Sequence, residues 1–390
     1  MLKLRKDKKR ICHNKKKYDV LLIGPLADND IIFAEHFIRM GLKCCVLRKK
    51  NTDNVNLTSY FHNLKKEDIY YFKNILEFIK IARESRLILC FTGYLLLIFK
   101  SLIIFISFLK LPPIINVATG SDIMELSKER STKGLIYRLY LSKVKLNWCP
   151  AYPEAIKNIL ELNIPNVIFM KYPYFFNEET ISLANKSDKE LITFFHPSNI
   201  DWGETDSRNG RKSTKGNDKF IRAFAKALKN GLNAKCIMLD RGPDKELAKK
   251  LIRELGVEKR IIWKSQLNRE ELRKEYEISD VVVDQFDVGG LGGISVEAMA
   301  CGKPVMTYVN INCLKILYTE LPPLLNCKTE EEIYEQIIKC QDRIYLQELG
   351  QKSYNWAYKN HHWKNCLDQF LFYYSLLTGH IIVDYGWDQK

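Results

Sequence analysis

Residues 289 to 305 read GGLGGISVEAMACGKPV and bring four glycines together just before the acid Glu297. Backbone N–H groups beside glycines can approach a ligand closely, because no Cβ stands in the way. A helix that begins near Gly293 adds unpaired N–H groups and the positive end of its dipole, and both favour an anion such as a diphosphate. The residues predicted to bind this anion are Gly290, Gly292, Gly293, Ile294 and Ser295.

Glu297 has two interpretations. In the first turn of the expected helix, an acid is favoured by the dipole alone. Its carboxylate also offers two acceptor oxygens, which suit the neighbouring hydroxyls of a ribose. The glycines beside it favour contact with a ligand. The helix is expected to be short, because Gly302 ends it and Pro304 begins the next strand.

The elements that position these residues alternate between short apolar runs and amphipathic segments. Residues 18 to 24 (YDVLLIG) predict a buried strand, and a helix follows over 31 to 41. The alternation starts again at residue 191 (LITFFHPSN), after the polar stretch 177 to 190. The sequence therefore predicts an α/β protein with two Rossmann-like domains, whose parallel sheets face a central cleft. The predicted segments are an arm over 1–17, domains over 18–185 and 186–360, and an aromatic-rich C-terminal helix and tail over 361–390.

Composition narrows the class of partner. The 390 residues carry a net charge of +15, which attracts nucleic acid, phosphorylated small molecules or acidic lipid. The 11 cysteines are scattered without Cys-x-x-Cys spacing, as in a reduced cytoplasmic protein. The basic start (MLKLRKDKKRICHNKKKYD) is followed by VLLIG, an apolar run too short for a signal peptide. It is either a solvated tail or a segment that lies on an anionic surface.

Residues 87 to 109 are almost entirely apolar, with Lys100 the one charge, and are long enough to span a bilayer. A span here would put parts of one sheet on opposite sides of a membrane. The alternative is a strand over 87 to 91, a turn, and a helix over 94 to 110. Such an apolar helix either packs on several sides or contacts a membrane surface. In the second case, we expect the protein to lie at the periphery of the plasma membrane, on its inner face.

The run DVVVDQFDVGGLGGISVEAMACGKPVMTY resembles the signature of retaining nucleotide-sugar glycosyltransferases of the GT-B fold, the group 1 or glycogen synthase-like superfamily. The resemblance implies a nucleotide-diphosphate sugar as donor, no metal or other cofactor, and a final helix that crosses back to the first domain. It assigns donor-ribose binding to Glu297. The acid that the family carries eight residues earlier is Gly289 here, and Asp287 and Asp284 are the candidates to replace it.

The segment STKGNDKFIRAFAKAL resembles the part of these enzymes in which a lysine meets the donor diphosphate, and Lys215 matches that lysine. An arginine usually lies upstream of it, and Arg208 and Arg211 are both available. Guanidinium and ammonium groups stabilise a departing pyrophosphate without a metal. The turn at Asp122 resembles one that lines the catalytic cleft, although a helix cap explains this acid equally well. The predicted catalytic residues are Lys215, Arg211 and Asp122; Asp287 and Arg208 complete the donor set.

Other signals are weak. Asp28 and Asp30 have the spacing of a metal-binding Asp-x-Asp, and His196 ends a strand near the cleft. The acceptor is expected to be a glycan, a lipid-linked molecule or a small molecule, and nucleic acid is not expected as a partner. Two alternatives to sugar transfer stay open: a nucleotide-sugar epimerase of the same fold, and a non-catalytic protein that binds nucleotides or nucleic acid.

Overall fold

The computed structural model describes residues 16–25, 28–49, 62–93, 110–174, 191–203 and 214–380. Its first half contains a sheet of seven parallel strands in the order β3-β2-β1-β4-β5-β6-β7. These are β1 (Tyr18–Ile23), β2 (Cys44–Lys49), β3 (Ile69–Phe72), β4 (Ser85–Phe91), β5 (Ile114–Val117), β6 (Leu146–Cys149) and β7 (Val167–Phe169). The central strands are continuous apolar runs because both faces of the sheet are covered.

Helices cover both faces of this sheet. The helices are α1 (Asn29–Arg39), α2 (Ile75–Arg83), α5 (Ser121–Met124), α6 (Thr132–Lys143) and α7 (Pro153–Glu161), with short turns η2 (Lys66–Asp68) and η3 (Leu126–Lys128). Apolar residues of α2, α6 and α7 pack with Leu21 and Ile23 of β1. Those of α1 pack with Val20 and Leu22, which point to the opposite face.

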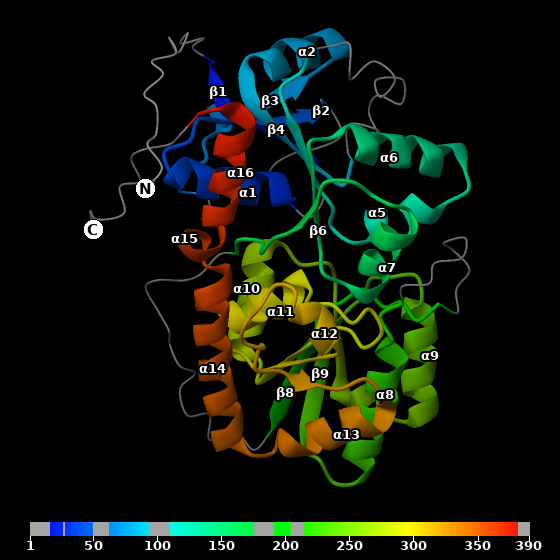
Figure 1. Cartoon of the computed structure of the whole chain (residues 1–390). Coiled ribbons are helices and arrows are strands. Elements are labelled where there is room, and N and C mark those ends of the chain that lie inside the picture. The colour runs from blue at the N-terminus through cyan, green and yellow to red at the C-terminus, as the bar shows by residue number, and fades with distance from the viewer. Residues whose placement is uncertain are drawn as a thin grey trace, which may run out of the picture.

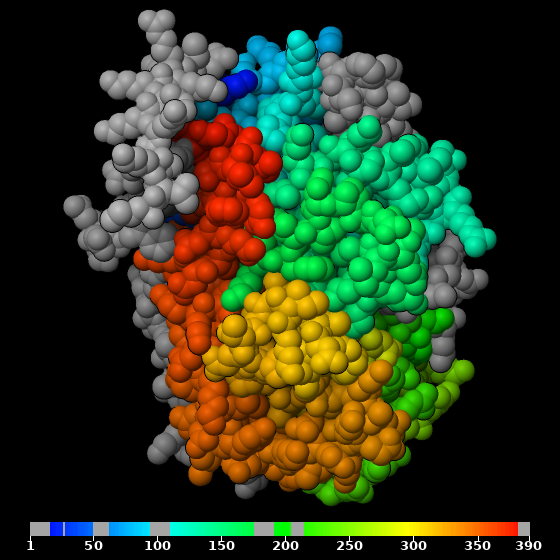
Figure 2. Space-filling view, viewed as in Figure 1, coloured from blue at the N-terminus to red at the C-terminus, as the bar shows by residue number. Residues whose placement is uncertain are grey.

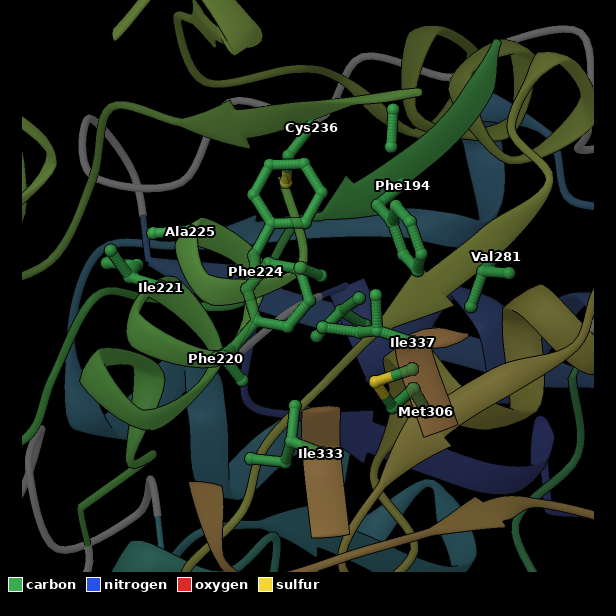
Figure 3. Packing of buried hydrophobic residues seen from close by; sticks show 14 of the residues in the cluster. Phe194, Phe220, Ile221, Phe224, Ala225, Cys236, Val281, Met306, Ile333 and Ile337 are labelled. Carbon is green, nitrogen blue, oxygen red and sulfur yellow. The ribbon is translucent and has the colours of Figure 1, made fainter. Parts of the chain in front are cut away.

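The second half repeats the design with six parallel strands in the order β10-β9-β8-β11-β12-β13. They are β8 (Ile192–His196), β9 (Ala234–Leu239), β10 (Ile261–Lys264), β11 (Val281–Val283), β12 (Val305–Thr307) and β13 (Leu325–Asn326). The other elements are α8 (Asn217–Lys229), α9 (Lys245–Leu255), η4 (Glu258–Arg260), α10 (Arg269–Ile278), α11 (Gly293–Ala300), α12 (Ile311–Leu314), α13 (Glu330–Lys339) and α14 (Arg343–His361). In the core, Phe220 and Phe224 of α8 lie against Phe194 of β8, beside Ile333 and Ile337 of α13 (Figure 3).

The last described residue of the first half lies beside the point at which the chain returns from the second half. Tyr174, at the end of the first half, pairs with His362, and its N–H donates to the carbonyl of His361 at 3.0 Å. After this crossing, α15 (Trp363–Cys366) and α16 (Asp368–Thr378) lie on the first half (Figure 1). There the ring of Phe370 stacks on Phe37 of α1, with 4.3 Å between centroids. Two Rossmann-like domains with a returning C-terminal helix confirm the predicted fold class.

Figure 2 shows the halves in contact, where green residues of the first half meet the gold segment that contains α12. The polar stretch 177–190, Arg208, Arg211, residues 94–109 and the first 15 residues lie outside the described residues. No helix in the described ranges combines the length and apolar character needed to cross a bilayer. The elements that were not predicted are β3, β13, α2, α6, α12, α13 and most of α14.

Candidate functional site

A cavity of about 700 Å³ lies between the two domains, at the carboxyl ends of strands from both sheets. Turns after parallel strands converge at this edge, as the fold class requires. The first domain contributes Asp28, Thr119, Ser121, Tyr152, Lys171 and Tyr174 to the lining. The second contributes Arg241, Gln266, Arg269, Leu291, Gly293, Ile294 and Glu297. The cavity therefore combines backbone of the α11 N-terminus, cations from both domains and two acids.

The N-terminus of α11 opens into the cavity. Gly292 is the N-cap residue, without a capping side chain, and Gly293 and Ile294 begin the helix and line the cavity. Their N–H groups have no acceptor one turn earlier in the helix, so this end suits an anion. Glu297 is the fifth residue of α11 and lies beyond its first turn, which corrects the predicted position. The helix dipole consequently explains this acid less well than a contact in the cavity does.

The carboxylate of Glu297 is held by two groups of α10. Nη1 of Arg269 lies 3.1 Å from one oxygen, and the hydroxyl of Tyr276 donates to the other at 3.4 Å. Arg269 also lies 3.9 Å from the carboxylate of Asp28, which belongs to the first domain. The predicted ribose-binding acid is therefore oriented towards the cavity, and a cation shared between the domains lies beside it.

The glycines before α11 accommodate side chains of the first domain. A Cβ at Gly290 would lie 1.9 Å from a ring carbon of Tyr152, and one at Gly289, where φ is +72°, would approach Pro153 to 3.2 Å. The hydroxyl of Tyr152 donates to the carbonyl of Leu291 at 3.3 Å. A Cβ at Gly293 would lie 3.2 Å from the hydroxyl of Tyr174. In this structure, the absence of side chains at these glycines thus lets residues of the first domain pack against the second.

Lys215 and Asp287 lie together on the loop side of β11. The N–H of Lys215 donates to the carbonyl of Asp201 at 2.6 Å, and its own carbonyl accepts from Phe286 at 2.8 Å. Asp287 binds Lys219 and accepts from the hydroxyl of Thr214 at 2.7 Å. Neither Lys215 nor Asp287 is among the described residues that line the cavity.

Asp284 and Ser295 form a buried polar cluster. Asp284 accepts from the hydroxyls of Ser198 at 2.6 Å and Ser295 at 2.8 Å. A Cβ at Gly292 would lie 2.7 Å from the same carboxylate, so this glycine lets α11 approach Asp284. Ser295 holds the helix against the sheet and does not line the cavity. Both carboxylate oxygens of Asp284 are thus occupied by serines.

Asp122 closes the turn between β5 and α5. Its carboxylate accepts from the N–H groups of Thr119 at 3.1 Å and Gly120 at 3.0 Å, and from the hydroxyl of Tyr137 at 3.0 Å. Burial raises the pKa of this carboxyl group. Gly120 is the N-cap of α5 without a side-chain cap, so Asp122 stabilises the turn that precedes the helix. Thr119 and Ser121, its neighbours, line the cavity.

The two acids at the start of α1 bind Arg48. Asp30 is buried and pairs with this arginine at 2.7 Å, and Asp28 lies 3.3 Å from the same side chain. His196 is also buried; its Nε2 lies 3.1 Å from the amide nitrogen of Asn217, and burial lowers its pKa to about 4. Among the described residues, no group of three or more His, Cys, Asp and Glu side chains has the arrangement of a metal site.

Several cavity residues were not predicted. Arg241 lies two residues after the end of β9, and Arg269 begins α10. Lys171 donates to Asn360 at 2.6 Å, near the point where the chain returns to the first domain. His361 lies between the hydroxyl of Tyr318 and the carbonyl of Tyr172, and burial lowers its pKa to about 4. Their positions at strand ends or domain boundaries were the available signal. Because the chain has 61 lysines and arginines, this signal alone does not identify which of them line the cavity.

Comparisons with known proteins bear on this site. Residues 210–320, which include Lys215, α11 and Glu297, match the family model described as Glycosyl transferases group 1. An uncharacterized glycosyltransferase of Methanocaldococcus jannaschii is 34% identical over 92 residues, which are 24% of this chain and 23% of the relative. The chain thus matches less than a quarter of the length of this curated relative.

Solved structures resemble nearly the whole chain. HepE of Anabaena in complex with UDP-glucose gives a TM-score of 0.64 at 15% identity and covers 92% of this chain and 100% of its own. A glycosyltransferase of Rickettsia africae gives 0.65 at 15% identity and covers 93% and 98%. Sucrose-phosphate synthase of Thermosynechococcus elongatus gives 0.60 at 13% identity and covers 93% and 100%. The chain therefore has the GT-B fold, and its residues 210–320 are similar to the group 1 glycosyl transferases.

Proposed function

We propose that this protein transfers a sugar from a nucleotide-diphosphate sugar to an acceptor hydroxyl, with retention of configuration. The observation that carries the proposal is the cavity between the domains, because the N-terminus of α11 and the carboxylate of Glu297 face it together. The first suits a diphosphate and the second suits a ribose diol. The match of residues 210–320 to a glycosyltransferase family supports the same reading.

In the proposed reaction, closure of the domains brings donor and acceptor together and excludes water. The bond between the anomeric carbon and the diphosphate breaks, and the acceptor oxygen forms its bond on the same face of the sugar. The acceptor proton leaves on a diphosphate oxygen, so no dedicated base is required. Lys215, with Arg211 or Arg208, stabilises the negative charge that grows on the departing diphosphate.

Nucleotide binding is the first test. UDP at 100 times its dissociation constant stabilises a protein by about 2.7 kcal/mol, and we expect Tm of the second domain to rise by roughly 5 °C. A panel of nucleoside diphosphates measured by thermal shift identifies the base. Glu297→Ala should reduce the rise, because it removes the acceptor for the ribose. Absence of a shift with every nucleoside diphosphate would contradict the proposal.

We further propose a lipid-linked or cell-envelope acceptor, reached from the inner face of the plasma membrane. Leu135 and Leu139 lie one turn apart on α6 with 51% and 45% of their surface exposed. Exposed Lys133 and Lys143 lie on the same helix. An apolar pair among lysines suits an anionic bilayer surface, as does the net charge of +15.

Vesicle sedimentation tests this position. At low salt we expect the protein to be retained on vesicles that contain phosphatidylserine, and Leu135→Ser with Leu139→Ser should lower that retention several-fold. Leu160→Ser, at an exposed leucine of α7, is the matched control. Equal recovery of the protein with and without anionic vesicles would argue against a membrane-bound acceptor.

A further inference from the structure

A line of alternating charges crosses the cavity from one domain to the other. Arg48 of β2 lies 3.3 Å from Asp28, Asp28 lies 3.9 Å from Arg269, and Arg269 lies 3.1 Å from Glu297. The last three all line the cavity, and their side chains are 44%, 24% and 24% exposed. Arg269 is therefore shared between an acid of the first domain and the predicted ribose-binding acid of the second.

Both contacts of Arg269 involve groups that are held in place. Asp28 is the N-cap of α1 with φ of 55°, and its N–H donates to the carbonyl of Pro25 at 3.1 Å. Its partner Arg48 is fixed in turn by two bonds to buried Asp30, at 2.7 and 2.9 Å. Arg269 begins α10 directly after Asn268, which forms a capping box with Glu271. Asp28 thus presents a negative charge to Arg269 from a fixed position.

A ribose at Glu297 would compete with Arg269. A diol uses both carboxylate oxygens, and in this structure Arg269 occupies one and Tyr276 approaches the other. A guanidinium that leaves Glu297 needs another carboxylate, because an unpaired charge in a partly buried site is costly. Asp28 is within reach. Movement of Arg269 towards Asp28 would also strengthen a contact between the domains.

We propose that Asp28 is a positioning residue for the donor site: it draws Arg269 away from Glu297 and so raises the affinity of Glu297 for the donor ribose. The proposal rests on the proposed function, since it assumes that Glu297 binds ribose. It places a determinant of donor affinity on the first domain, at a residue that acts only through Arg269.

A double-mutant cycle tests this coupling, with UDP as the probe and titration calorimetry as the measurement. We expect Asp28→Asn to weaken UDP binding about fivefold, the upper end for a partly exposed ion pair. In an Arg269→Gln background, the same substitution should have no effect. Asp28→Glu, which keeps the charge, should restore most of the affinity. Asp68→Asn removes a charge from the same domain outside the cavity lining and should leave UDP binding unchanged.

Further measurements separate the outcomes. If Asp28→Asn lowers Tm, Asp28→Gly replaces it in the cycle, because glycine adopts the left-handed backbone of this position without strain. Equal weakening by the Asp28 substitution with and without Arg269 would overturn the coupling while leaving the proposed function intact. If the wild-type protein binds no nucleoside diphosphate of the panel, or if Glu297→Gln binds the nucleotide as tightly as wild type, both proposals fail.

Discussion

Alanine at Glu297 or at Lys215 should lower the rate of sugar transfer by about two to three orders of magnitude, the loss that follows removal of one preorganised charged group from an active site. The two variants should differ in how they lose activity. Glu297→Ala removes the ribose acceptor and should act mainly through donor affinity, at about 1.5–3 kcal/mol for each hydrogen bond to a charged group. Lys215→Ala removes charge stabilisation that develops only as the diphosphate departs, so kcat should fall more than KM rises.

The measurement is release of nucleoside diphosphate, with and without acceptor. Glu270→Ala and Lys250→Ala change exposed residues that pair within their own helices, so they are matched controls and should retain wild-type rates. Conversion of the donor to an isomer without acceptor would identify an epimerase instead. Nucleotide binding without any turnover of donor, in wild type as in both variants, would favour the non-catalytic alternative.

Alanine at Gly290 should hold the domains apart. The new Cβ would lie 1.9 Å from the ring of Tyr152, so one of the two must move. We expect activity to fall by about 100-fold, since a displacement of about 1 Å can cost that much in catalysis. UDP should still bind, because the clash involves the first domain and leaves the N-terminus of α11 intact. Small-angle scattering should report a larger radius of gyration than for wild type.

Tyr152→Ala provides the compensating change. In the protein that carries both substitutions, the small side chain at position 152 leaves space for the new methyl group. The radius of gyration should therefore equal the wild-type value. Gly256→Ala is the control for stability: it adds a methyl group with nothing within 4 Å and outside the cavity lining, and its cost is the strain of alanine at φ +70°. It should lower Tm but leave the activity and the radius of gyration at their wild-type values. A Gly290→Ala protein with wild-type scattering and activity would show that the contact with Tyr152 is not needed for closure.

The fold was largely predictable because its signals are local. Strand β1 is a continuous apolar run, and α8 alternates apolar and charged residues with helical period. One of the strands that were missed, β3, has two exposed tyrosines, and it lies at the edge of the sheet, where burial imposes no clear pattern. Helix α2 follows it and was missed with it.

The candidate site was predictable only in part, because its remaining residues meet through long-range contacts. Gly293, Ile294 and Glu297 belong to one short segment, so their joint place in the cavity follows from local sequence. Asp287, by contrast, pairs with Lys219, which is 68 residues away along the chain. The place of Arg269 between two acids likewise depends on how the domains meet, and nothing in the local sequence specifies that.

Tyr174, at the end of the first half, pairs with His362, where the chain returns to that half. This pairing holds the halves together at one place, so we expect any rotation of the domains to pivot near these residues. Atoms close to a rotation axis travel least. The start of α11 lies beside Tyr174, so we expect its surroundings to change least when the domains move, whereas the rim of the cavity farthest from the axis should open widest.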